Sequence, residues 1–159
     1  MTNEERFVKL DRMRYTKNSL SSMLALLAIV FDVLFFVSIY QSNVGTYYYN
    51  ILMGASVLYN LVFMLVAFLS SEGVKNYKSG YSWLLIALGV GQIVRIFILP
   101  MQAHAALLKN VPVMGDTQFI YVVACLCISA VCCFASAVIN LIKSRQLAEH
   151  IASLEKQAA

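Results

Sequence analysis

Residues 20–40 read LSSMLALLAIVFDVLFFVSIY, an almost unbroken apolar run with one acidic residue, Asp32, in its interior. An α-helix rises about 1.5 Å per residue, so roughly 20 such residues cross the ~30 Å of hydrocarbon in a bilayer. Similar runs occur at residues 49–69, 81–100 and 119–142. Runs of this length favour membrane-spanning helices over helices buried in a soluble core. The sequence therefore predicts an all-α integral membrane protein, a bundle of four transmembrane helices.

The composition agrees with a bundle that has little else attached to it. Hydrophobic residues make up 60% of the 159 residues and charged residues 13%, whereas soluble domains are nearer to half and a quarter. The connections between the runs are short, and the residues before the first run do not have the pattern of a cleavable signal peptide. The net charge of +4 comes from residues beside the runs. It predicts contact with a lipid bilayer and no nucleic-acid partner.

Lysine and arginine residues near the run ends gather on one side of the predicted bundle. Four lie close before the first run, two lie in the loop after the second, and three follow the fourth, whereas the remaining loops hold one. In that order they are Lys9, Arg12, Arg14 and Lys17; Lys75 and Lys78; Lys143, Arg145 and Lys156; and Lys109. The positive-inside rule places both termini in the cytoplasm. The short outer loops, and cysteines confined to the spans, favour a multi-pass protein of the plasma membrane.

The N-terminal tail is expected to be helical. Thr2 and Glu5 have the spacing of a capping box, and apolar residues recur on one helical face beyond them. We interpret residues 1–18 as an amphipathic helix on the inner leaflet, with a solvated charged tail as the alternative. Residues 19–142 then form the transmembrane bundle.

The C-terminal tail, residues 143–159, carries Leu147, Ile151 and Leu154 in one apolar stripe. Neither glycine nor proline ends the fourth run, so its helix is expected to continue to about Lys156. The stripe is too short for a stable coiled coil. It predicts docking on a cytoplasmic surface, either of this chain or of a partner.

The outer connection after the third run is the longest. Apolar residues continue past Pro100 to Leu108, so the third helix is expected to kink at the proline and extend outward. His104 lies in this connection without a second histidine close in sequence. We interpret it as a solvated surface residue.

Polar residues inside the runs are the clearest functional signal. Asp32 and Arg95 lie about 18 and 21 Å from the cytoplasmic ends of their runs, and Asn60 and Gln92 fall at a similar level. A charge facing lipid is costly, so it normally turns inward and finds a partner. We predict that Asp32 binds Arg95 and that Asn60 or Gln92 satisfies the remaining donors.

Small residues mark the faces along which helices approach closely. One stripe leads to Asp32 and another to Arg95, and the first and third spans are expected to face each other along them. The stripes comprise Ser21, Ala25 and Ala28 in the first span, and Ala87 and Gly91 in the third. The alternative reading of the polar residues is a proton or ion relay or a polar ligand site, but no chain of acidic residues leads to either face.

The fourth span holds every cysteine of the chain: Cys125, Cys127, Cys132 and Cys133. Their spacing does not match a metal site, and no cofactor motif accompanies them. Cys125, Ser129, Cys132, Ser136 and Asn140 form a further stripe of small or weakly polar residues, which we interpret as a packing face. A redox dithiol inside the membrane is the alternative.

The sequence contains no P-loop, nucleophile elbow or H-E-x-x-H motif, and no catalytic residues can be assigned. We expect a non-enzymatic accessory or structural subunit that packs against a larger membrane complex such as a transporter, or against copies of itself. The second hypothesis is an oligomeric small transporter or channel that uses Asp32, Asn60, Gln92 and Arg95. An enzyme of lipid or redox chemistry ranks third because no two reactive groups have catalytic spacing.

Overall fold

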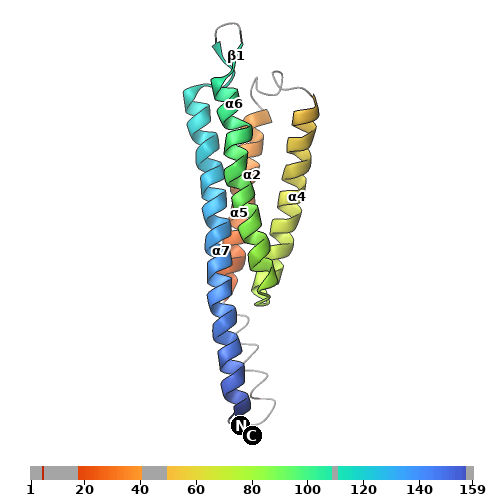
Figure 1. Cartoon of the computed structure of the whole chain (residues 1–159), viewed down its shortest axis with the longest axis vertical. Helices are drawn as coiled ribbons and strands as arrows, with labels where there is room; N and C mark the ends of the chain where they lie inside the picture. Colours follow the sequence, from red (N-terminus) through yellow and green to blue (C-terminus); the bar gives the residue numbers. More distant parts are fainter. Residues whose placement is uncertain (1–4, 6–17, 41–49, 109–110, 157–159) are drawn as a thin grey trace.

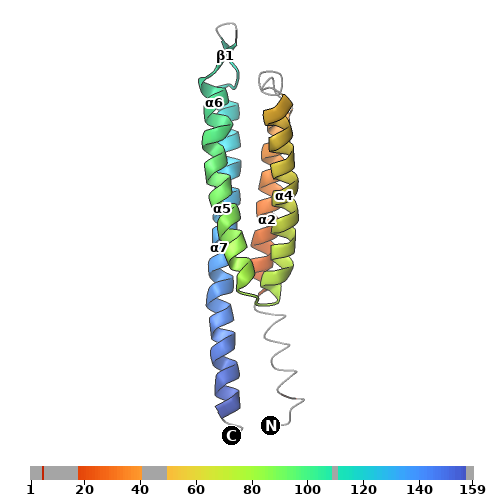
Figure 2. The same cartoon turned by 45° about the vertical axis from the view of Figure 1, so that its right-hand side comes forward.

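The structure, a computed structural model, describes Glu5 and residues 18–40, 50–108 and 111–156. Its long helices run side by side (Figures 1 and 2) and comprise α2 (Ser19–Tyr40), α4 (Asn50–Lys75), α5 (Gly80–Ile98) and α7 (Asp116–Lys156). Four stretches of helix are long and apolar enough to cross a membrane. The predicted helical bundle of four potential spans is therefore confirmed. The amphipathic helix predicted over residues 1–18 lies outside the described residues, apart from Glu5 and Asn18.

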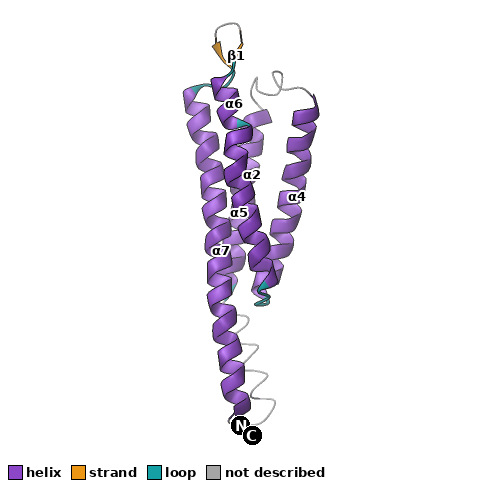
Figure 3. Cartoon of the chain, in the orientation of Figure 1, coloured by secondary structure: helices purple, strands orange, loops and turns teal. Residues whose placement is uncertain are grey.

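Almost all of the described secondary structure is helical, as Figure 3 shows. The exception is a two-residue antiparallel pair, β1 (Leu107–Leu108) and β2 (Val111–Pro112), in the connection between α5 and α7. We call this end of the bundle the outer end, and the end that carries the α4–α5 turn the inner end. The pair closes a small hairpin above the ends of the helices. It does not alter the helical character of the bundle.

The four helices form a ring in which α7 is the main packing partner. It packs most extensively against α2 and α5, and α2 also packs on α4, whereas the contact between α4 and α5 is smaller. Figure 2 shows α2 beside α4 and α5 beside α7. The first and third spans, α2 and α5, therefore lie diagonally across the ring. The prediction that they face each other as neighbours is wrong.

Pro100 divides the outward end of the third span into two helices. Proline has no N–H and cannot continue the backbone ladder, so α5 ends at Ile98 and α6 (Pro100–Ala105) begins at the proline. Leu99 between them has φ −111° and ψ −60°, close to helical, so the break is slight. The predicted interruption at Pro100, and the continuation of the helical path beyond it, are confirmed.

The turn between α4 and α5 is tight and has the geometry of a Schellman motif. The Lys78 N–H donates to the Gly73 carbonyl at 3.2 Å, and the Tyr77 N–H donates to the Val74 carbonyl at 3.1 Å. Tyr77 has φ 58°, in the left-handed region where this motif usually has glycine. Tyr77 as a whole is 9% exposed, and burial raises the pKa of its hydroxyl.

The last helix continues well beyond the bundle, as predicted from the absence of a terminating residue. Asn140 of α7 hydrogen-bonds to Asn18 and Ser82, which lie at the starts of α2 and α5. Asn140 therefore marks the level at which the other helices end. Residues 141–156 extend α7 by about 24 Å past that level.

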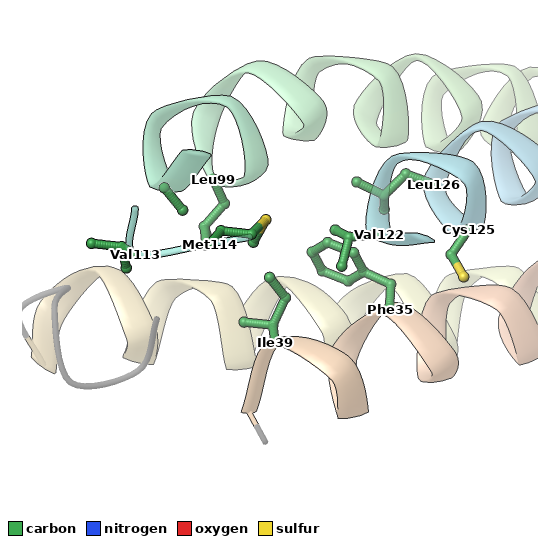
Figure 4. Close-up of a cluster of buried hydrophobic side chains, with 9 residues drawn as sticks. Phe35, Ile39, Leu99, Val113, Met114, Val122, Cys125 and Leu126 are labelled. Carbon is green, nitrogen blue, oxygen red and sulfur yellow. The ribbon is translucent and has the colours of Figure 1, made fainter. Parts of the chain in front are cut away.

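The apolar interior is divided into two clusters. The outer cluster gathers side chains from α2, the end of α5, the outer connection and α7 (Figure 4), among them Phe35, Leu99, Met114 and Leu126. The inner cluster is built largely of small residues and includes Ala25, Ala28, Ala67, Leu85 and Cys133. Along α2 and α5, the polar residues Asp32, Gln92 and Arg95 lie between the members of the two clusters.

Candidate functional site

Asp32 and Arg95 form an ion pair in the bundle interior. The Arg95 Nη1 atom lies 3.0 Å from Asp32 Oδ1, and Gln92 Nε2 donates a hydrogen bond to the same oxygen at 2.9 Å. Arg95 and Gln92 lie three residues apart on α5, so both point from one helical face toward α2. The contact predicted between Asp32 and Arg95 is present, and the long arginine side chain makes it across the diagonal of the ring.

The helix α4 supplies further partners for the guanidinium group. Arg95 Nη1 also donates to Asn60 Oδ1 at 2.6 Å, and Nη2 donates to Ser56 Oγ at 3.1 Å. Both Asn60 and Gln92 therefore take part, where the sequence analysis expected one or the other. We call Asp32, Ser56, Asn60, Gln92 and Arg95 the central polar cluster.

Two aromatic rings cover the Arg95 guanidinium group. Its Cζ atom lies 4.2 Å from the centroid of the Phe35 ring and 4.8 Å from that of the Tyr59 ring. A cation over the face of an aromatic ring is attracted to it, and more strongly where water is excluded. The rings therefore contribute to stabilising the charge as well as shielding it.

The central polar cluster is buried in the bundle interior. Asp32 and Gln92 are 0% exposed, Asn60 is 2% exposed and Arg95 is 6% exposed. The two charges compensate each other, and neutral amide and hydroxyl groups surround them. Such an arrangement allows ionised side chains to remain inside a low-dielectric bundle.

Sequence reasoning missed Ser56, Phe35 and Tyr59. Helical spacing could have identified two of them, because Ser56 lies four residues before Asn60 and Phe35 lies three residues after Asp32. Tyr59 adjoins Asn60 in sequence, and its place beside Arg95 depends on how α4 is rotated against α5. Sequence alone does not define that rotation.

The small-residue stripe of α2 faces α7. Ser21 Oγ donates to the Ser136 carbonyl at 2.7 Å, Ser136 Oγ donates to the Ser21 carbonyl at 2.6 Å, and Ser129 Oγ donates to the Ala28 carbonyl at 2.9 Å. Ala25 and Ala28 are fully buried. Side-chain to backbone bonds of this kind require close helix approach, which small residues permit. The stripe is therefore a packing face, with α7 as its partner instead of α5.

The stripe predicted on α5 is partly wrong. Ala87 is exposed and Gly91 is half-buried, whereas Gly89 belongs to the buried face. Each residue turns a helix by about 100°, so Ala87, eight residues before Arg95, is rotated by about 80° from it. Residues spaced four apart therefore move gradually around the helix and do not all stay on one face. Gly91 instead adjoins Tyr59 of α4, whose hydroxyl lies 2.6 Å from where a Cβ atom would stand.

A second polar network ties the helices together at the inner end of the bundle. Asn18 Nδ2 donates to the Val74 carbonyl and to Asn140 Oδ1, the latter at 2.8 Å. Asn140 Nδ2 donates to Ser82 Oγ at 2.7 Å and to the Lys78 carbonyl at 3.2 Å. We call this the inner asparagine lock. It joins all four long helices and the α4–α5 turn. The sequence places Asn140 on the packing stripe of the fourth span, but it does not indicate the partners Asn18 and Ser82, which are far from Asn140 in sequence.

The cysteines lie along α7 as free thiols. Cys125, Cys132 and Cys133 are buried and Cys127 is exposed. With Ser129 and Ser136, which are fully buried, Cys125 and Cys132 form a continuous inward face. In the described ranges, no group of three or more histidine, cysteine or acidic residues could hold a metal ion.

The side chain of His104 is 38% exposed, which agrees with the solvated position expected of it, and it also contacts its neighbours. Its ring stacks on Phe119 at a centroid distance of 4.5 Å, and its Nδ1 atom lies 3.3 Å from the Met114 carbonyl. Its Nε2 atom is 3.9 Å from Asp116 Oδ1. His104 thus fastens α6 to the start of α7 at the outer end.

Several buried polar atoms in the described part of the chain have no hydrogen-bond partner. They are Asp32 Oδ2, Asn60 Nδ2, Gln92 Oε1, the Tyr59 hydroxyl, Asn18 Oδ1 and Ser70 Oγ. An unsatisfied buried group typically costs about 1–3 kcal/mol. The first four belong to the central polar cluster or to the ring that covers it, so the unsatisfied groups are concentrated there. No protein-family model matches the chain, and no curated protein or solved structure is significantly similar to it.

Proposed function

We propose that the protein is a non-enzymatic integral membrane subunit that packs against a larger membrane complex such as a transporter. On this proposal both termini face the cytoplasm and the membrane is the plasma membrane, as the distribution of lysine and arginine suggests. The observation that carries the proposal is α7, which extends about 24 Å past Asn140 on the side of the α4–α5 turn. A helix that leaves the membrane without a break is suited to holding a partner in the cytoplasm.

The contacts within the bundle support a structural role. The charges of Asp32 and Arg95 compensate each other inside one chain, and the inner asparagine lock fastens the helix ends. These features stabilise a fixed helix arrangement, which is what a scaffold subunit needs. On the α7 extension, Leu147 is buried, whereas Arg145, Gln146 and Glu149 are exposed. A partner would therefore meet a mainly polar face.

Affinity purification from native membranes in mild detergent tests this proposal. A matched pair of charge exchanges isolates the extension, since both conserve net charge and both lie at the same end of the molecule. Arg145→Glu with Glu149→Lys alters the α7 extension, and Glu72→Lys with Lys75→Glu alters the end of α4. We expect a stoichiometric partner with the unaltered chain and with the α4 control. Misplaced charges oppose association, so the α7 variant should retain about tenfold less partner.

Two results would count against the proposal. One is recovery of the chain from native membranes as a monodisperse monomer. The other is equal retention of the partner by the α7 variant and the α4 control, which would mean that the extension is not the contact. Mass measurement of the purified particle distinguishes a partner from further copies of the same chain.

A second candidate function is an oligomeric small transporter or channel whose route passes the central polar cluster. The unpartnered Asp32 Oδ2, Asn60 Nδ2 and Gln92 Oε1 atoms favour it, because intramembrane polar groups often mark a solute path. Purified protein in liposomes should then conduct protons, ions or a small solute. Asp32→Asn should abolish the flux, whereas Asp116→Asn, at an exposed outer site, should not. Absence of flux from the unaltered protein would remove this candidate.

A further inference from the structure

We propose that the central polar cluster is a binding site for an ordered water molecule, held by Asp32 Oδ2, Asn60 Nδ2 and Gln92 Oε1 beside the Tyr59 hydroxyl. Each of these atoms is buried and without a hydrogen-bond partner in the described part of the chain. The inference goes beyond the subunit function and does not depend on it.

The unpartnered atoms belong to groups that are already joined to one another. Asp32 Oδ1 accepts from Gln92 Nε2 at 2.9 Å and from Arg95 Nη1 at 3.0 Å, and the same Nη1 donates to Asn60 Oδ1 at 2.6 Å. Asp32, Asn60 and Gln92 each use one of their two side-chain polar atoms in these hydrogen bonds. In each residue, the other polar atom is the one without a partner. The free atoms therefore lie at the margin of a single network.

The net charge of the network determines what kind of molecule can bind there. Asp32 and Arg95 neutralise each other, so a bound cation or anion would leave a net charge in a site that is 0–6% exposed at these residues. An uncompensated charge is strongly disfavoured inside a membrane bundle. A neutral polar guest adds hydrogen bonds and no charge.

The donors and acceptors of the site match those of water. Asp32 Oδ2 and Gln92 Oε1 accept, Asn60 Nδ2 donates, and the Tyr59 hydroxyl can do either. Water has two donors and two acceptor sites, and buried waters typically make about three hydrogen bonds to groups that would otherwise be unsatisfied. A water molecule within reach of all three atoms would donate to both acceptors and accept from Asn60.

The inner asparagine lock provides a comparison within the same molecule. Asn140 is 0% exposed, as deeply buried as Asn60 at 2%. Both of its polar atoms are engaged, since Nδ2 donates to Ser82 Oγ and to the Lys78 carbonyl, and Oδ1 accepts from Asn18. Burial is thus matched, and the unused Nδ2 donor distinguishes Asn60 from Asn140, although Asn18 Oδ1 beside Asn140 is itself unpartnered.

Nuclear magnetic resonance of the full chain in lipid nanodiscs, with ¹⁵N-labelled side-chain amides, tests the proposal. We expect cross-peaks between water and the Asn60 side-chain amide that have opposite signs in NOE and ROE spectra, the signature of a long-lived bound water. Absence of the Asn60 cross-peaks, or cross-peaks of equal sign in both spectra, which report proton exchange alone, would overturn the proposal.

A pair of variants tests which groups hold the water. Gln92→Met removes the Oε1 acceptor, together with the Nε2 donor that bonds Asp32 Oδ1, at nearly constant volume. It should abolish the Asn60 cross-peaks. Ser70→Ala removes an unpartnered hydroxyl outside the cluster and should leave them unchanged. Retention of the cross-peaks in folded Gln92→Met protein would contradict the assigned site. If that variant does not fold, the spectra of the unaltered chain still decide the proposal.

Discussion

Replacing Asp32 by Asn or Arg95 by Gln leaves one charge inside the bundle without its counter-charge. Breaking a buried ion pair typically costs about 3–5 kcal/mol, whereas removing both charges together costs less. We therefore expect each single variant to unfold at a lower temperature than the double variant Asp32→Asn with Arg95→Gln. Thermal unfolding in detergent, monitored by circular dichroism, measures the unfolding temperatures of the three variants. A double variant no more stable than either single variant would show that the pair is not coupled.

The polar residues of the interior were largely predictable. Charged and amide groups are rare in membrane spans, and they normally face the bundle interior because exposure to lipid is costly. Asp32, Asn60, Gln92 and Arg95 could be grouped from depth alone. Tyr59 and Asn18 could not. An aromatic ring or an asparagine near a span end carries no signal until the rotation of its helix is known.

Glycines of α4 provide a test at the level of the element. A Cβ atom at Gly73 would stand 2.2 Å from the Tyr81 ring of α5, whereas one at Gly54 would meet nothing within 4 Å. We expect Gly73→Ala to lower the unfolding temperature, because the α4–α5 turn cannot close on Tyr81. Gly54→Ala should raise it slightly, since alanine favours helix over glycine by about 0.8–1 kcal/mol. Equal effects of the two variants would show that the close approach at the turn is unimportant.

Helix positions followed from sequence more readily than helix neighbours. Hydrocarbon thickness determines how long an apolar run must be, and the break at Pro100 follows from the missing N–H. The order of the helices around the ring depends on which stripe of small residues packs against which other stripe. Ala28 could pack against any stripe of small residues, and the partner it has, on α7, becomes evident only from the bond between Ser129 and its carbonyl.

For the whole molecule, the sidedness of the bundle can be tested with single cysteines. Asp116 lies at the outer end with its side chain 89% exposed, and Glu149 is exposed on the α7 extension. We expect Asp116→Cys to react with a membrane-impermeant thiol reagent in intact cells, and Glu149→Cys to react only after permeabilisation. The unaltered chain corrects for its native cysteines. The reverse pattern would contradict the orientation inferred from lysine and arginine.

The unbroken course of α7 has a mechanical consequence. Residues 116–140 of this one helix are packed in the bundle, chiefly against α2 and α5, and the inner asparagine lock holds the helix at Asn140. The helix is therefore clamped over about 36 Å and projects for about 24 Å past the clamp. A sideways load on the projecting part is borne first by the hydrogen bonds around Asn140, so that all four long helices resist it together.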